Sequence, residues 1–376
     1  MDEGFARLRH GRALAESGGD GEACLLIDVY ESDALLKTAR VTDAAEVARR
    51  GLDNARQAGL DAFWTTAILA GNGAEALVHQ GRTEDAAALI GPLTDGPAGR
   101  DTWLAHVHRA EIDLLLGDKA AAIARQEQTA ATVGQVGSDD WSREGALRAA
   151  ELRLWTGAPD RVLAGIRPVL NGLKSPGQTI FCGPLLTLGM RACADLAEQA
   201  RARRDPVAEG TALADAEDLA ELAARLPDDP FAEHPFAATI PAECASFEAE
   251  RTRLTGLGVP GDPAAWHAAA KAWEGFDSPH RAGYAWWRYA QARLAAGQEA
   301  AGPLRTAAGL AAGHAPLLAE IRKLALRARI PLDVGTAPAG GQGPAGNYGL
   351  TEREVLVLRL VAAGRTNAPR DEQGLE

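Results

Sequence analysis

The stretch LVHQGRTEDAA, residues 77–87, contains the pattern that decides the fold of this chain. An apolar segment ends at Gly81, a short polar turn follows, and an alanine-rich segment starts after Glu84 and Asp85. Glycine favours the left-handed conformation that ends a helix, and acidic residues are favoured in the first turn of the next helix. The stretch therefore predicts two helices joined by a tight turn.

Three further stretches repeat this order of residues. They are LLLGDKAA (114–121), LWTGAPD (154–160) and LAAGQEAA (294–301). The turn glycines fall at 81, 117, 157 and 297, in steps of 36, 40 and 140 residues. Tetratricopeptide-type hairpins repeat at roughly 34 residues, and one hairpin cannot bury its apolar face without neighbours. We predict an all-α, tetratricopeptide-like helical-repeat superhelix over residues 1–332, with further degenerate hairpins inside the long last step.

The composition supports a helical protein and narrows its partners. The 376 residues are 46% hydrophobic and 24% charged, with only 5% aromatic residues. Alanine and leucine, both strong helix formers, dominate. The formal net charge of −12 argues against a broad surface for nucleic acid or for an anionic membrane.

The cysteines and the N-terminus indicate a cytoplasmic location. Cys24, Cys182, Cys193 and Cys244 lie far apart and form no Cys-x-x-Cys pair, so we expect reduced thiols without metal. The first residues, MDEGFARLRHGR, lack the apolar core of a signal peptide. No apolar run reaches the roughly 18 residues that a membrane span needs, and we predict no membrane partner.

A second signal lies near the C-terminus. Residues 333–349 (DVGTAPAGGQGPAGNYG) have the composition of a flexible Gly/Pro linker. Residues 350–367 (LTEREVLVLRLVAAGRTN) follow, in which Thr351 and Glu354 form a capping box at the start of a short amphipathic helix. Gly364 ends that helix and Thr366 starts the next one, which predicts the opening of a helix-turn-helix.

This segment resembles the opening of the LuxR-type DNA-binding domain, whose pattern is L-T-x-R-E, then V-L-x-L, then G-x-T-N. Ten residues match in order: Leu350, Thr351, Arg353, Glu354, Val357, Leu358, Leu360, Gly364, Thr366 and Asn367. The resemblance implies a transcriptional regulator that binds promoter DNA. The resemblance gives four of these residues a role at the DNA, where they would help to position a phosphate or the fold. They are Thr351, Arg353, Thr366 and Asn367.

The sequence departs from the family after Asn367. The residues APRDEQGLE supply no apolar face for the remaining helices, so the recognition helix that reads bases has no counterpart. Residues 350–376 also carry four arginines against five carboxylates, a formal net charge of −1, which offers no basic stripe for phosphates. We therefore expect a truncated helix-turn-helix in residues 350–376.

The order of repeats, linker and helix-turn-helix resembles the C-terminal part of the large ATP-binding subclass of LuxR-type regulators. In that subclass an ATPase domain precedes the repeats. This chain contains no G-x-x-x-x-G-K-[ST] loop, so we predict no nucleotide binding and no cofactor.

The clearest cluster of candidate binding residues is aromatic. Trp266, Trp273 and Phe276 are followed by Tyr284, Trp286, Trp287 and Tyr289. At helical spacing Tyr284 shares a face with Trp287, and Trp286 with Tyr289, so one core cannot hold them all. Packing between repeats is one explanation. The other is a ligand or partner groove, for which the candidates are Trp273, Tyr284, Trp287 and Tyr289.

Catalytic and metal-binding patterns are weak. His106 and His108, two residues apart, point to different faces of a helix, and we expect them to be surface or partly buried side chains rather than metal ligands. Acidic residues are diffuse, without a nucleophile or histidine at a recognisable spacing, so we predict no enzymatic activity.

Two functions remain open at the level of sequence. In the first, the chain is a LuxR-type transcriptional regulator whose repeats sense an inducer or a protein partner and whose C-terminal segment binds promoter DNA. In the second, it is a helical-repeat interaction module with no DNA binding of its own. The sequence does not decide between a monomer and a homo-oligomer.

Overall fold

The structure is a computed structural model that describes residues 2–99, 101–133, 139–172, 181–224, 234–255 and 260–332. These residues form one compact unit within Met1–Asp333. The predicted linker, residues 333–349, and the predicted helix-turn-helix, residues 350–376, lie outside the described residues, as do Thr351, Arg353, Thr366 and Asn367. These predictions stay untested.

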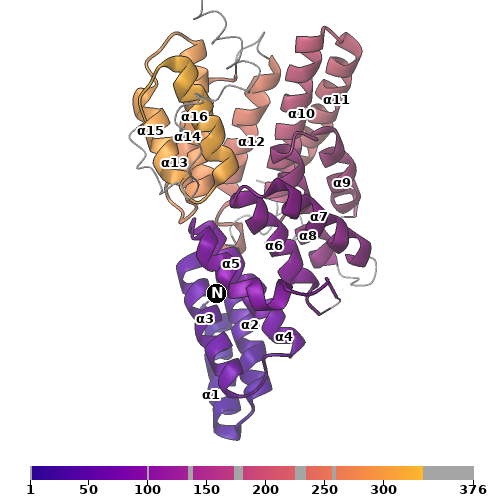
Figure 1. The fold of residues 1–376 in the computed structure, drawn as a ribbon, viewed down its shortest axis with the longest axis vertical. Coiled ribbons are helices and arrows are strands. Elements are labelled where there is room, and N and C mark those ends of the chain that lie inside the picture. Colours follow the sequence, from indigo (N-terminus) through magenta and orange to yellow (C-terminus); the bar gives the residue numbers. More distant parts are fainter. Residues whose placement is uncertain are drawn as a thin grey trace, which may run out of the picture. The chain divides into compact units, whose positions relative to one another are not determined.

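The described residues form an all-α structure of sixteen α-helices and one short 3-10 helix (Figure 1). The first nine helices are α1 (Asp2–Gly18), α2 (Gly21–Lys37), α3 (Val41–Gln57), α4 (Trp64–His79), α5 (Thr83–Thr94), α6 (Trp103–Leu115), α7 (Lys119–Val133), α8 (Asp139–Trp155) and α9 (Asp160–Asn171). The rest are α10 (Gly183–Arg203), α11 (Pro206–Ala223), η2 (Pro235–Ala237), α12 (Ile240–Thr255), α13 (Pro263–Trp273), α14 (Pro279–Ala295), α15 (Ala301–Leu310) and α16 (Ala315–Ala328). The predicted fold class is confirmed at this level.

Consecutive helices pack against each other in pairs, as expected for a helical repeat. The pairs α2–α3, α4–α5, α6–α7, α8–α9, α10–α11, α12–α13 and α14–α15 all make extensive contacts. The first helix of one pair also contacts the first helix of the next, from α2 through α4, α6, α8 and α10 to α12. In Figure 1 the labels of paired helices lie beside each other, for example α10 with α11.

The predicted turn glycines all lie between two paired helices. Gly81, Gly117, Gly157 and Gly297 have φ values of 75°, 96°, 83° and 70°, in the left-handed region that favours glycine. Each follows the first helix of a pair, so the repeat predicted from sequence is confirmed at these four turns. The long step between 157 and 297 contains the pairs α10–α11 and α12–α13, as predicted.

Stacked pairs bury a continuous apolar interior. Leu25, Leu69 and Ile112 belong to one cluster, which joins α2–α6. A second cluster joins α8–α12 and contains Ile166 and Met190. These residues are at most 2% exposed, so neighbouring pairs stabilise one another by removing apolar surface from water.

The last helices of this unit return to the first ones. Thr83, at the start of α5, donates a hydrogen bond from its hydroxyl to the carbonyl of Gly313, at 2.7 Å. The Thr42 hydroxyl, in α3, donates to the Asp277 carboxylate at 2.9 Å. Helix α16 also packs against α6. The inner faces of early and late helices therefore surround shared interior space.

Candidate functional site

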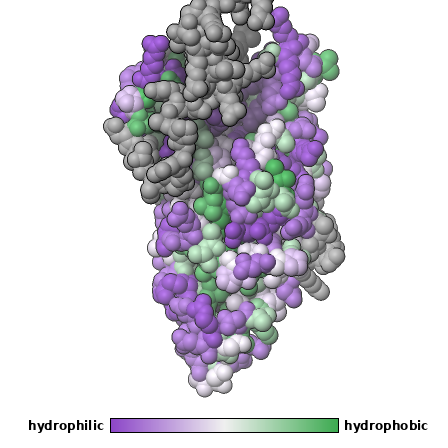
Figure 2. Space-filling model, in the orientation of Figure 1, coloured by the Kyte–Doolittle hydropathy of each residue, from purple (hydrophilic) through white to green (hydrophobic). Residues whose placement is uncertain are grey.

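A groove of about 440 Å³ runs along the first helices of the pairs. Its walls come from α2, α4, α6 and α8 on one side and from α10, η2, α12 and α14 on the other. Tyr30 and Trp64 line it while 58% and 48% exposed, which is high for large aromatic side chains. Figure 2 shows hydrophobic atoms gathered among hydrophilic ones over the N-terminal helices. The groove thus offers apolar surface that no described residue covers.

Arg148, on α8, organises the charges along the groove. Its guanidinium lies 2.7 Å from a carboxylate oxygen of Glu111, 2.7 Å from Glu144 and 2.9 Å from Glu75. Burial by itself raises the pKa of Glu75 and of Glu111, but the attraction of Arg148 outweighs it and leaves both pKa values below their ordinary range. Carboxylates from α4, α6 and α8 therefore surround one buried cation, and the charge of that cation keeps Glu75 and Glu111 ionised.

This cluster includes a set of side chains with metal-binding chemistry. Ligand atoms of Glu75, His108 and Glu144 all lie within 4.8 Å of one another. Arg148, however, already contacts both glutamates, and its fixed positive charge would repel a divalent ion placed among them. The carboxylates have a cation partner, and the geometry favours a structural charge network over a metal centre.

The histidine pair lies differently from the expectation. His106 and His108 are 0% and 1% exposed on α6, so the prediction of surface or partly buried side chains was wrong. The cause is tertiary: α6 contacts α4, α5, α7, α8 and α16, and neither face of the helix meets solvent. Burial, followed by repulsion from Arg125 and Arg109, lowers the pKa of His106 to about 4.

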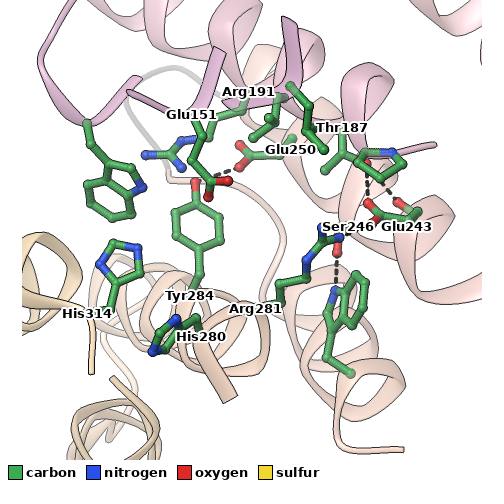
Figure 3. A pocket seen from close by; sticks show the side chains of 15 residues that line it. Glu151, Thr187, Arg191, Glu243, Ser246, Glu250, His280, Arg281, Tyr284 and His314 are labelled. Atoms are coloured by element: carbon green, nitrogen blue, oxygen red, sulfur yellow. Dashed lines mark hydrogen bonds and ion pairs between the residues drawn. The ribbon is translucent and has the colours of Figure 1, made fainter. Parts of the chain in front are cut away.

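A second, smaller cavity of about 90 Å³ adjoins the groove (Figure 3). It shares with the groove the lining residues Leu147, Pro184, Glu243, Trp273 and Arg281. Its polar groups come from α8, α10, α12, α14 and the residue before α16. They are Glu151, Thr187, Arg191, Glu243, Ser246, Glu250, His280, Arg281, Tyr284 and His314.

Helix α10 places Arg191 at this cavity. A side chain at Gly189 would begin 2.7 Å from Ile166 of α9 and 2.9 Å from Leu219 of α11, so only glycine lets both helices approach α10 so closely. Two residues further on, the Arg191 side chain points to the opposite side and enters the cavity (Figure 3). The close packing of α10 thereby fixes the position of the guanidinium.

Arg191 is stacked between two aromatic rings. Its guanidinium carbon lies 4.5 Å from the ring centre of Trp155 and 4.5 Å from that of Tyr284. Such cation–π contacts hold a guanidinium in place without neutralising it. Arg191 is only 7% exposed, and among the described residues its guanidinium forms neither an ion pair nor a hydrogen bond. Arg191 is thus a buried cation that no carboxylate of the described residues contacts directly.

Glu151 lies on α8, one helix turn after Arg148, and its carboxylate has no cation of the described residues in direct contact. Its carboxyl group faces the cavity near Tyr284 (Figure 3) and has no hydrogen-bond or ion-pair partner in the described part of the chain. Burial, followed by repulsion from Glu111, raises the pKa of Glu151. The charges of Arg281, Arg148 and Arg191 act on Glu151 from a distance, but none of these cations contacts it as Arg148 contacts Glu111.

The other two carboxylates of the cavity, those of Glu250 and Glu243, have hydrogen-bond and ion-pair partners. Glu250 accepts hydrogen bonds from the Tyr284 hydroxyl at 2.6 Å and from Arg253 at 2.6 Å. Glu243 pairs with Arg281 and accepts a hydrogen bond from the Thr187 hydroxyl at 3.0 Å. These pairs make up the wall of the cavity and leave no unbalanced charge.

Two histidines close the cavity on the side of α14 and α16. The rings of His280 and His314 have centres 5.2 Å apart, and His314 also packs edge-on against Trp155 at 4.9 Å. Burial lowers the pKa of His280 to about 4 and that of His314 well below its ordinary value. Both rings are neutral at pH 7.

Of the four aromatic residues predicted for a ligand or partner groove, two line the cavity and two pack between helices. Trp273 and Tyr284 line the cavity. Trp287 instead stacks on Arg288, at 4.6 Å, and Tyr289 packs against Trp286 and His267 between α13 and α14. The predicted shared faces are present, since Tyr284 contacts Trp287 at 5.6 Å and Trp286 contacts Tyr289 at 5.5 Å.

Sequence reasoning missed the charged residues of both sites. Arg148 and Glu151 occur in α8 among several other charged residues, so nothing in the sequence marks them as buried. Glu75, in contrast, is the only charged residue of TTAILAGNGAEALV, residues 65–78. Arg191 carried a usable signal, because it is the only charged residue in LLTLGMRACA, residues 185–194. A lone cation in a stretch of small and apolar residues indicates a buried charge with a specific role.

No family model matches this chain, and a search of curated proteins finds no relative.

In the described residues no helix is both long enough and apolar enough to cross a membrane.

Proposed function

We propose that this chain is a LuxR-type transcriptional regulator, in which a tetratricopeptide-like helical array senses a small inducer or a partner and the C-terminal segment binds promoter DNA. The observation that carries the sensing role is the cavity in which Arg191 and Glu151 lack partners, next to an open groove. Interiors seldom retain uncompensated charges unless those charges have a use. The ten-residue match at positions 350–367 supports the DNA-binding role.

The array connects the two proposed roles in a physically simple way. The cavity is lined by helices from the middle and the C-terminal part of the described unit, including α8, α10, α12, α14 and the residue before α16. A molecule bound there contacts several helix pairs at once, so it favours whichever packing of these pairs gives the better contacts. Helix α16 is the last described helix before the segment proposed to bind DNA.

Retention on immobilised duplex DNA tests the regulatory role. We expect this chain to be retained at low ionic strength and released as salt approaches physiological strength, because few phosphate contacts are available. A chain that lacks residues 350–376 serves as the matched control and is expected to pass through unretained. Equal behaviour of the two chains would contradict the assignment of DNA binding to this segment.

A second candidate function is favoured by the exposed aromatic residues of the groove. Tyr30 and Trp64, together with Leu26 at 37% exposure, form an apolar mouth suited to an extended or helical segment of a partner protein. In this case the chain is an interaction module without DNA binding. Indifference to DNA, combined with a stable complex that Tyr30→Ala and Trp64→Ala weaken, would support it.

A further inference from the structure

Two unpaired groups of opposite charge face the small cavity. Arg191 is held by Trp155 and Tyr284 but contacts no carboxylate, and Glu151 contacts no cation. They do not pair with each other either, since no oxygen of Glu151 lies within 4.0 Å of the Arg191 guanidinium. Each group therefore has capacity for one strong charge-assisted hydrogen bond.

Arg191 and Glu151 are the charged side chains of the described cavity wall that have no ion-pair or hydrogen-bond partner in direct contact, although their charges attract each other across the cavity. Glu243 and Glu250 are paired with Arg281 and Arg253. The two histidines are neutral, since burial lowers their pKa values. A ligand that complements the cavity must then supply one negative and one positive group and carry no net charge.

The size and the opening of the cavity define the rest of the ligand. A volume of about 90 Å³ is smaller than the roughly 150 Å³ cavity that accommodates benzene, so only a few non-hydrogen atoms fit. Where the cavity meets the groove, its wall is formed by the apolar side chains of Leu147, Pro184 and Trp273 together with the ion pair of Glu243 and Arg281. A short apolar group attached to the charged part of the ligand fits at this junction.

We propose that this cavity binds a free α-amino acid, with its carboxylate on Arg191, its ammonium group on Glu151 and its side chain toward the groove. Arginine suits a carboxylate because its planar donors form two parallel hydrogen bonds. This inference rests on the proposed sensing function, to which it adds the chemical class of the inducer.

Three matched probes test the assignment by thermal unfolding of the full chain. Alanine carries both charged groups, propionate lacks the ammonium group, and ethylamine lacks the carboxylate. A ligand that binds only the folded state raises the unfolding temperature. We expect alanine to raise it more than either single-charge probe at equal concentration, and longer apolar amino acids to differ from alanine through contacts at the groove.

Variants of the two charged residues assign the contacts. Arg191→Met and Glu151→Gln are each expected to weaken alanine binding by roughly tenfold or more, the loss of one charge-assisted contact. Arg191→Lys keeps the charge and is expected to retain part of the binding. Arg49→Met, a change of an exposed arginine on α3, is the control and should leave binding unchanged.

Several outcomes would overturn the proposal. One is stabilisation by propionate equal to that by alanine, which would indicate a site for anions alone. Another is alanine binding that survives in both Arg191→Met and Glu151→Gln. A third is the absence of any effect of amino acids on the wild-type chain. Retention on DNA requires no ligand, so these outcomes leave that test of the proposed regulator separate.

Discussion

Arg148 and Arg191 are both buried arginines on the inner side of the array, yet their surroundings are opposite. Arg148 contacts three carboxylates within 2.9 Å, whereas Arg191 contacts aromatic faces and no carboxylate. The two sites lie close together, because α8 carries both Arg148 and Glu151. This difference separates two roles of buried charge: the ion-paired cluster around Arg148 stabilises the fold, whereas we propose that Arg191 and Glu151, which have no direct partner among the described residues, bind a ligand.

The largest expected difference in stability is between the two single variants Arg148→Met and Arg191→Met. Arg148→Met leaves three carboxylates around an uncompensated site and should lower the free energy of unfolding by roughly 3–5 kcal/mol. Arg191→Met removes a cation that has no anion and keeps the apolar part of the side chain, so the change should stay within about 1 kcal/mol. Urea unfolding at pH 7 without ligand measures both. Equal losses of unfolding free energy in the two variants would contradict the distinction between a structural Arg148 and a ligand-binding Arg191.

The pH dependence of stability between pH 7 and pH 5 should come from three buried histidines with lowered pKa values, His280 and His314 at the cavity and His106 on α6. His280 has a pKa of about 4 in the fold against 6.5 unfolded, so the unfolded chain takes up the proton first as pH falls below about 6.5. Between pH 7 and pH 5 this removes about 2 kcal/mol of stability. His280→Asn should lose correspondingly less over the same range, as measured by urea unfolding at the two pH values.

The carboxylates of the groove, Glu75 and Glu111, should not contribute to the change in stability between pH 7 and pH 5. Glu75 and Glu111 have lowered pKa values, so their contribution is present above the unfolded pKa and is lost only as pH falls through the folded value. Between pH 7 and pH 5 they remain ionised. If His280→Asn shows the same pH slope as the wild type, His280 is not among the causes.

Glu111, on α6, and Glu151, on α8, allow a finer comparison. Glu111→Gln removes one charge from the Arg148 network and should destabilise the chain by about 1.5 kcal/mol. Glu151→Gln removes a carboxylate whose charged form is disfavoured in the fold, so stability should stay the same or rise slightly. Thermal unfolding of both variants at pH 7 gives the sign directly. A loss in Glu151→Gln as large as that in Glu111→Gln would mean that Glu151 has a partner.

The helices that carry the two arginines also end differently. Helix α8 is followed by Gly157 at φ 83°, whereas α10 is followed by Arg204 at φ 55°. A side chain in the left-handed region is strained, so Arg204→Gly should stabilise the chain by about 0.5 kcal/mol and Gly157→Ala should destabilise it by about 1 kcal/mol. Denaturation midpoints of the two variants give the comparison. A destabilising Arg204→Gly would show that the arginine side chain matters more than its backbone strain.

These turns also explain how far the sequence predicted the fold. Where glycine occupies the left-handed position, at 81, 117, 157 and 297, the hairpin was predictable. The equivalent position is Arg204 between α10 and α11 and Ala39 between α2 and α3. Neither residue type signals a left-handed turn, because tertiary packing imposes the conformation there. The α10–α11 pair was therefore expected only as a degenerate unit inside the long step, and the α2–α3 pair was not predicted from a turn signal.

The candidate site was predictable only in part, for a related reason. Tyr284 and Trp273 were found because aromatic clusters stand out in a chain that has few aromatic residues. Arg191 and Glu151 meet only because α8, α10 and α14 pack around one space. Hydrogen bonds such as Thr83 to Gly313 close that space across most of the unit, and local sequence patterns do not encode contacts of this range.

The side-chain NMR signals of the two arginines test the central claim most directly. In a chain labelled with 15N-arginine, the Nε–H signals of Arg191 and Arg148 are assigned by their absence from the spectra of Arg191→Met and Arg148→Met. On titration with alanine, the account predicts a shift of the Arg191 signal and none of the Arg148 signal. An Arg191 signal that stays unchanged while alanine stabilises the chain, or a shift of Arg148 alone, would contradict it.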